Sequence, residues 1–212
     1  GVVFMIYEFR TYDLKVRSVP QVLENFAEVI EKRQELSKLC AFWYTEIGPL
    51  NQIIHVWEYK DAAERDKIRS EAVKHDWWPP KIGKFVIRQT VEIFKPWENS
   101  PLLTPGDNGP FYEMRSYLIQ AGLMPQAKAR WAPNIEERVK RSPLAVVMEG
   151  DVGTYNKMVH IWPYKSLDER LKIRTQAKED NVWPPQGDPD LPFETIEQEN
   201  KIMLPAPFSP MK

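Results

Sequence analysis

The sequence predicts an α+β fold built from two similar halves, and two observations support this prediction. Three motifs recur at the same offset of 105 residues: Tyr7–Tyr12 with Tyr112–Tyr117, His55–Lys60 with His160–Lys165, and Trp78–Pro80 with Trp183–Pro185. This period is the size of a small domain, whereas solenoid repeats run to roughly 20 to 50 residues. The second observation is that each half has the order strand, helix, strand, strand, helix, strand. One folding unit has therefore been duplicated and fused.

Each half begins with alternating aromatic and β-branched residues, which predict a strand over Val3–Tyr12. Ser18–Gln21 has the pattern of a capping box, and the apolar residues behind it recur at helical spacing. These residues are Val22, Leu23, Phe26, Val29 and Ile30, with Ala127, Trp131 and Ile135 in the second half. We therefore expect a first helix with one apolar face.

Two further strands and a second helix follow in each half. In the first half, strands are expected at about Ala41–Ile47 and Gln52–Tyr59, joined by the turn residues Gly48–Asn51. Asp61–Glu64 is a capping box that begins the second helix, and Ser166–Glu169 is its counterpart. That helix must end before the paired prolines of the Trp-Pro-Pro motif. The last strands are expected near Phe85–Lys95 and Thr195–Leu204.

This order of elements is the split βαβ pattern of the ferredoxin-like fold. Both helices of such a unit cover one face of its sheet, so the other face must be buried against a further layer. We predict two four-stranded antiparallel sheets that face one another as a dimeric α+β barrel within a single chain. The expected domains are a first ferredoxin-like repeat at 1–96, a linker at 97–110 and a second repeat at 111–212.

Composition argues against several classes of function. The net charge is −1 with acidic and basic residues interleaved, which does not favour a nucleic-acid-binding face. No apolar run approaches the roughly 18 to 20 residues of a membrane helix, so no membrane insertion is expected. Cys40 is the single cysteine and only three histidines occur, so we predict no internal disulfide, no metal site and no cofactor. A cytoplasmic location is expected.

The alternation of side chains along the strands predicts a polar and aromatic lining for the barrel. The aliphatic pair Ile54 and Val56 is expected to face the helices, which leaves the opposite face of each strand for the barrel interior. The catalytic candidates on that face are Glu8, His55, Glu113 and His160. The substrate-binding candidates are Arg10, Tyr12, Trp57, Tyr59, Arg115, Tyr117, Trp162 and Tyr164.

Two interpretations of this set stay open. In the first, the barrel binds a small molecule, and a glutamate acts as base, an arginine binds an anion and a histidine shuttles a proton near neutral pH. The protein is then a cofactor-independent enzyme or a binding protein. In the second, Glu8 with Arg10 and Glu113 with Arg115 are structural ion pairs, and the protein is an interaction scaffold with a purely structural core.

Two pairs of arginines lie one turn apart on the second helix of each half. They are Arg65 with Arg69 and Arg170 with Arg174. Because charged residues of both signs surround them, we expect these arginines to belong to a solvated outer face.

The motifs resemble those of the NIPSNAP family. The matching features are Tyr-Glu-x-Arg-x-Tyr at the start of each half, Gly-x-x-Asn before His-[Val/Ile]-Trp-x-Tyr, and the closing segment Pro207–Lys212. The resemblance covers nearly the entire chain. It implies a dimeric α+β barrel but no established active site, because the family has no generally agreed chemistry.

Eukaryotic members of that family are associated with mitochondria and with protein interactions in mitochondrial quality control. The resemblance therefore implies a mitochondrial location if this is a eukaryotic protein whose targeting peptide has been removed. Each half is expected to bury the inner sheet face of the other. Any further assembly is expected to be a homodimer formed through outer strands or helices.

Overall fold

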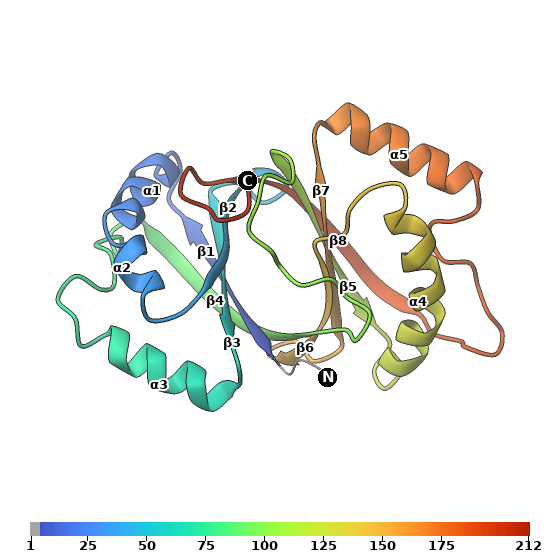
Figure 1. The fold of residues 1–212 in the computed structure, drawn as a ribbon, viewed down its shortest axis with the longest axis horizontal. Helices are drawn as coiled ribbons and strands as arrows, with labels where there is room; N and C mark the ends of the chain where they lie inside the picture. The colour runs from blue at the N-terminus through green and yellow to red at the C-terminus, as the bar shows by residue number, and fades with distance from the viewer. Residues whose placement is uncertain (1–4) are drawn as a thin grey trace.

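The computed structural model describes residues 5–212 and contains an eight-stranded barrel with helices on two opposite sides (Figure 1). The elements of the first half are β1 (Ile6–Leu14), α1 (Val19–Ala27), α2 (Ile30–Gln34), β2 (Leu39–Ile47), β3 (Gln52–Tyr59), α3 (Ala62–Ala72) and β4 (Val86–Pro96). Those of the second half are β5 (Phe111–Ile119), α4 (Met124–Val139), β6 (Val146–Val152), β7 (Lys157–Tyr164), α5 (Leu167–Glu179) and β8 (Thr195–Pro205).

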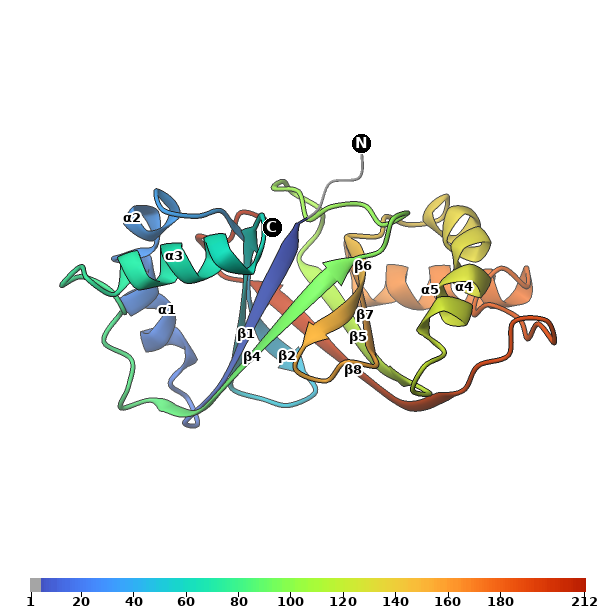
Figure 2. The same ribbon diagram turned by 90° about the horizontal axis from the view of Figure 1, so that it is seen from below.

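The two predicted sheets are present, and their edges join to close the barrel. The strand order is β1-β3-β2-β8-β5-β7-β6-β4, and all eight pairings are antiparallel. The β2–β8 and β4–β6 pairings connect the halves, for example where Lys95 lies opposite Glu149. Figure 2 shows α1, α2 and α3 on one side of the barrel and α4 and α5 on the other. The predicted α+β barrel within one chain is confirmed.

Most of the expected elements are confirmed with small shifts of their ends. The strand expected at Gln52–Tyr59 is β3, and both expected last strands are present as β4 and β8. The two capping boxes of the second helices are confirmed, because Asp61 Oδ1 accepts from the Glu64 N–H at 2.8 Å and Ser166 Oγ accepts from the Glu169 N–H at 3.0 Å. The expected start of the first strand at Val3 lies outside the described residues.

The expected first helix differs from the structure in two ways. Ser18 forms no cap, because its backbone is already helical and its hydroxyl donates instead to the Lys15 carbonyl at 2.6 Å. The helix of the first half is also interrupted after Ala27 and resumes at Ile30, whereas α4 is continuous. The apolar stripe is nonetheless buried, as shown by Val22, Phe26, Ile30, Ala127, Trp131 and Ile135.

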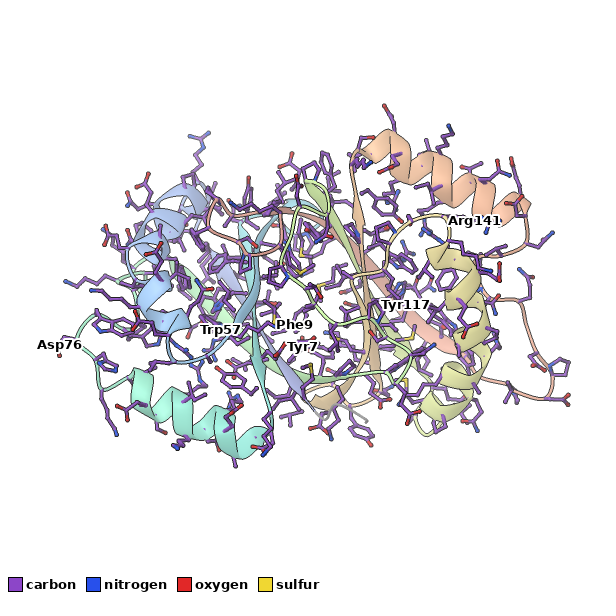
Figure 3. The ribbon with its side chains drawn as sticks, viewed as in Figure 1. Tyr7, Phe9, Trp57, Asp76, Tyr117 and Arg141 are labelled. Carbon is purple, nitrogen blue, oxygen red and sulfur yellow. The ribbon has the colours of Figure 1, made fainter. Side chains whose placement is uncertain are left out.

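The expected assignment of the two strand faces is wrong. Ile54 and Val56 lie inside the barrel, in one buried cluster with residues of the second half such as Tyr112. Trp57 packs instead with the helices of the first half, and Figure 3 shows it on the helix side of the barrel, with Tyr7 and Phe9 inside. The reason is that the second helix of each half extends arginines toward the glutamate-bearing face of its sheet, so the polar face meets the helices and the aliphatic face is left for the interior.

The segment 97–110 packs against the body of the protein and crosses one opening of the barrel (Figure 1). Leu103 is buried in the interior cluster, and its N–H donates to the Tyr7 hydroxyl at 3.1 Å. The C-terminus lies beside it, because Met211 joins the same cluster and the Tyr112 hydroxyl donates to the Lys212 carbonyl at 3.1 Å. This end of the barrel is thus closed by chain rather than left open to solvent.

The position of Phe9 in the barrel interior predicts that its side chain contributes strongly to stability. Phe9 is 1% exposed and meets Phe94 edge to face with centroids 5.3 Å apart. We expect Phe9→Ala to lower the free energy of unfolding by about 3 to 5 kcal/mol, because it opens a cavity between the sheets. Urea unfolding followed by circular dichroism measures this. The control Val16→Ala, at a residue 76% exposed, should stay within about 0.5 kcal/mol. Equal effects of the two substitutions would contradict the interior position of Phe9.

Candidate functional site

The structure brings the sequence-predicted site residues together in two clusters, one in each half. Both clusters lie between a sheet and its own helices, and they do not face each other across the barrel. The first contains Glu8, Arg10, Tyr12, His55, Trp57 and Tyr59. The second contains Glu113, Arg115, Tyr117, His160, Trp162 and Tyr164. The expected lining of the barrel interior is therefore wrong in its location, and these residues form two separate clusters, one in each half.

Glu8 is the centre of the first cluster. Its side chain is fully buried in β1 and accepts from Arg10 Nη1 at 2.8 Å, which confirms the expected ion pair. Two more guanidinium groups reach it from α3, Arg65 through Nε and Arg69 through Nη1 at 3.0 Å. The carboxylate of Glu8 thus joins β1 to α3.

Glu113 has the same place in the second cluster. Its Oε1 accepts from Arg115 at 2.7 Å, from Arg170 at 2.6 Å and from Asn200 at 2.9 Å, while Arg174 lies 3.9 Å from Oε2. Burial alone would raise the pKa of this carboxyl. The hydrogen bonds from Arg170 and Asn200, with the charges of Arg174 and Arg115, outweigh burial and lower the pKa to about 2. Glu113 is therefore ionised at neutral pH and is a weak base.

A tyrosine hydroxyl continues each cluster. Arg10 Nε donates to the Tyr12 hydroxyl at 2.8 Å, and Arg115 Nε donates to the Tyr117 hydroxyl at 2.7 Å. Each phenol oxygen is an acceptor in this bond, so its own proton is free to be donated elsewhere. The arginines therefore orient these hydroxyls as hydrogen-bond donors.

Each histidine is fixed by a neighbouring tryptophan. Trp57 Nε1 donates to His55 Nδ1 at 2.8 Å, and Trp162 Nε1 donates to His160 Nδ1 at 2.6 Å. Burial and the adjacent arginine charges lower the pKa of His55 well below its usual value and that of His160 to about 3. Each ring is thus neutral at neutral pH, with its proton on Nε2, and the expected proton shuttle near pH 7 does not fit this environment.

The histidine Nε2 atoms have no hydrogen-bond partner within residues 5–212, although both are buried. The His55 ring is surrounded by aromatic rings, with centroid distances of 5.0 Å to Tyr12, 5.1 Å to Phe42 and 5.4 Å to Phe26. An unpaired buried N–H group costs free energy, typically about 1 to 3 kcal/mol. Such a group is uncommon in folded proteins, and here it occurs at the same place in both halves.

A pocket of about 300 Å³ lies near His55, which is not itself one of the lining residues, between α1, the start of β4 and the segment that follows α3. It is lined by Tyr12, Phe26, Trp78, Pro79, Pro80, Ile82, Gly83, Val86 and Gln89. Two of these residues, Tyr12 and Phe26, also contact the His55 ring. The pocket is therefore mostly apolar and aromatic.

The corresponding region of the second half is filled by a larger side chain. Trp131 stands where the repeat has Phe26, and its ring is 4.8 Å from Trp183, compared with 6.2 Å between Phe26 and Trp78. Trp131 also packs against Trp97 from the segment that joins the halves. The two clusters share their polar framework and differ in the space beside it.

A protein-family model described as NIPSNAP matches this chain twice, at residues 7–101 and 112–210. The chain belongs to the NIPSNAP family. Its relatives include Protein NipSnap homolog 3B of Mus musculus, which is 30% identical over 97% of this chain and 85% of its own length. Protein NipSnap of Drosophila melanogaster is 26% identical over 97% of this chain and 78% of its own length.

The fold extends beyond the NIPSNAP family. A monooxygenase-like protein from Fusobacterium nucleatum superimposes with a TM-score of 0.68, covering 97% of this chain and 94% of its own, at 10% sequence identity. At that identity the likeness shows the shared barrel fold alone. Within residues 5–212, no helix is long and apolar enough to cross a membrane. In the same range, no three residues among His, Cys, Asp and Glu are grouped as a metal site would require.

The site of this NIPSNAP protein contains residues that sequence reasoning missed. Arg65, Arg69 and their counterparts Arg170 and Arg174 were expected on a solvated outer face, and this was wrong because they bind the buried glutamates. Asn200 was missed as well. The arginines recur at the offset of 105 residues, and that recurrence is the signal that could have placed them in the site.

One further arginine in each half was also missed. Arg33 lies 4.4 Å from the centre of the Trp57 ring, and Arg138 lies 4.4 Å from that of Trp162. Arg138 also donates to Tyr164 at 3.0 Å, so that tyrosine binds an arginine rather than lining a pocket. Such a cation–π contact stabilises a buried guanidinium that has no carboxylate partner.

The Glu8 cluster predicts how α3 is attached. Ala72 is the one fully buried residue of α3 and Ile68 packs partly buried against the same cluster, so the ion pairs to Glu8 add to a small apolar contact in holding this helix to β1. We expect Glu8→Leu to lower the free energy of unfolding by about 3 kcal/mol, at the low end for a broken buried pair because the arginines are partly exposed and can be hydrated. Amide hydrogen exchange should accelerate in α3 and not in α1. The control Glu71→Leu, at an exposed residue of α3, should change neither quantity. Exchange in α3 that is as slow in the Glu8→Leu variant as in the wild type would contradict the attachment of α3 through Glu8.

The buried histidines predict a loss of stability in mild acid. The pKa of His160 is about 3 in the folded protein and near 6.5 in the unfolded chain, so the unfolded chain binds a proton that the folded one does not between these values. Stability should therefore fall as pH decreases from 6.5, on the order of 2 kcal/mol per buried histidine by pH 5. Urea unfolding at pH 7, 6 and 5 tests this. His160→Asn should roughly halve the dependence of the unfolding free energy on pH, because His55 remains. An unchanged dependence would rule out the buried histidines as its cause.

Proposed function

We propose that this protein binds a small, flat, largely apolar molecule in the pocket beside His55. The observation that carries this proposal is an aromatic pocket of about 300 Å³ next to a buried histidine whose Nε2 has no partner among residues 5–212. Ligand sites are typically apolar concavities with a few polar groups, and drug-sized ones run from about 300 to 1,000 Å³. This pocket is at the lower end of that range, which favours a ligand of one or two rings.

The polar groups at the pocket are hydrogen-bond donors rather than acids or bases. The Tyr12 hydroxyl is oriented by Arg10 so that its proton is free, and Gln89 adds an amide at the exposed rim. A ligand with one hydroxyl or carbonyl oxygen would match this arrangement. The neutral His55 and the ion-paired Glu8 are not poised for proton transfer near pH 7, so the geometry favours binding over acid–base catalysis.

A wider groove of about 1010 Å³ lies where β4 meets β6, and it supports a ligand less well. Charged side chains dominate its rim, and several are already paired. Lys95 binds Asp151 at 2.6 Å, and Lys128 binds Glu149. Side chains that already form ion pairs with each other gain little free energy by breaking those pairs to bind a ligand.

The difference between the halves provides a direct test with 1-naphthol as the probe. We expect isothermal titration calorimetry to show one site per chain, with a dissociation constant between about 10 μM and 1 mM for a ligand of this size. Phe26→Trp copies the second half and should weaken binding at least about tenfold, because the larger ring fills the pocket. Trp131→Phe copies the first half and should add a second site.

Thermal unfolding of both variants controls for loss of structure, since a larger core side chain can cost about 1 to 3 kcal/mol. Binding that is unaffected by Phe26→Trp in a folded variant would place the probe elsewhere and refute the pocket. No binding to the wild-type protein, together with no gain in Trp131→Phe, would favour the alternative of an interaction scaffold with a purely structural core.

A further inference from the structure

The two arginine clusters differ in charge because of one residue on the second helix. In the first half, Asp66 accepts from Arg65 Nη1 at 2.9 Å. Leu171 stands at the matching place of the second half and is 63% exposed. Three guanidinium groups therefore share two carboxylates in the first cluster but only Glu113 in the second.

The guanidinium groups of the second cluster are also less fully engaged. Arg69 donates to Glu8 at 3.0 Å, whereas its counterpart Arg174 is 3.9 Å from Glu113 and makes no hydrogen bond to any residue of the described chain. Arg170 uses one amino group on Glu113, and its Nε is buried without a partner in the same range. Oε1 of Glu113 accepts from three donors, while Oε2, the oxygen nearer to Arg174, is buried without a hydrogen-bond partner among residues 5–212.

These arginines are placed where a ligand can reach them. Arg170 and Arg174 are one turn apart on α5, so their side chains extend from the same face of the helix. Their side chains are 23% and 28% exposed, so both are partly accessible to solvent. A planar guanidinium group binds a phosphate or carboxylate through paired hydrogen bonds, and two such groups on one helix face can contribute to the same oxyanion.

We propose that Arg170 and Arg174 form a binding site for the oxyanion group of a small molecule, a phosphate or a carboxylate. The site is specific to the second half, because Asp66 supplies the corresponding negative charge in the first. It is separate from the pocket beside His55 and does not depend on that pocket's ligand.

The first experiment uses inorganic phosphate and acetate as separate probes, in calorimetric titrations at an ionic strength held constant with sodium chloride. We expect one site per chain for at least one of the two probes, and the stronger probe identifies the class of oxyanion. Arg174→Gln should weaken binding about tenfold or more. The matched control Arg69→Gln, at a residue of similar exposure, should stay within about twofold of the wild type.

The second experiment exchanges the residues that distinguish the halves. Leu171→Asp should abolish the site by supplying the missing carboxylate to Arg170. Asp66→Leu should create a second site in the first half and raise the stoichiometry from one to two. Both changes are on an exposed helix face, so circular dichroism should show folded proteins.

The proposal fails if neither probe binds beyond the effect of sodium chloride. It also fails if Arg69→Gln and Arg174→Gln weaken binding equally, because the arginines would then act through the fold. Binding that is unchanged in Leu171→Asp would equally overturn it. None of these outcomes bears on 1-naphthol binding, so the two proposals succeed or fail independently.

Discussion

A buried carboxylate at the centre of each sheet joins the strands to the second helix of that half. Apolar burial is small for these helices, since α3 fully buries only Ala72 and α5 only Ala177, with Ile68 and Ile173 partly buried beside them. Glu8 and Glu113 accept the arginines that α3 and α5 extend inward, and a buried charge of this kind is tolerated only when it is paired and hydrogen-bonded. Burial, with the positive charges of arginines that include Arg69 and Arg174, lowers the pKa of the histidines and keeps them neutral. Helix attachment and the electrostatics of the candidate site are therefore one interaction.

The architecture could be predicted from the sequence because it depends on features that repeat. The offset of 105 residues identified the duplication, and the alternation of side chains with the capping boxes located strands and helices to within a few residues. Because helices cover only one face of each sheet, the other face must pack against the second sheet, and this leads to the barrel. The side-chain alternation separates the two faces of a strand but does not say which one meets the helices. Ile54 and Val56 were assigned by the rule that aliphatic residues meet helices, and that rule fails when the helix is as polar as α3.

The sequence predicted the strand residues of the clusters but not the helix residues, again because α3 is so polar. Glu8, Arg10 and His55 can be singled out in a strand, because a polar or ionisable side chain in a mostly buried element needs a partner. Arg65 and Arg69 are ordinary on a helix with many charged neighbours, and nothing local to α3 marks its inward side. Only the recurrence of these arginines in the second half indicates that they point inward. Asn200 gives no such signal, because it lies beyond the insertion that breaks the offset and its structural counterpart in β4 is Val91.

Duplication also explains how the two halves could come to differ without loss of the fold. The glutamate and arginine framework is present in both, which is expected if each helix needs it for attachment. The residues around that framework are under no such constraint, and they diverge in opposite directions. The first half has the smaller Phe26 and the additional carboxylate of Asp66, which leave space beside its histidine and one more acidic partner for its arginines. The second half has Trp131 and Leu171, which close that space and leave its arginines short of acidic partners. The apolar pocket of one half and the excess of positive charge in the other thus result from sequence differences at different positions of the same repeated unit.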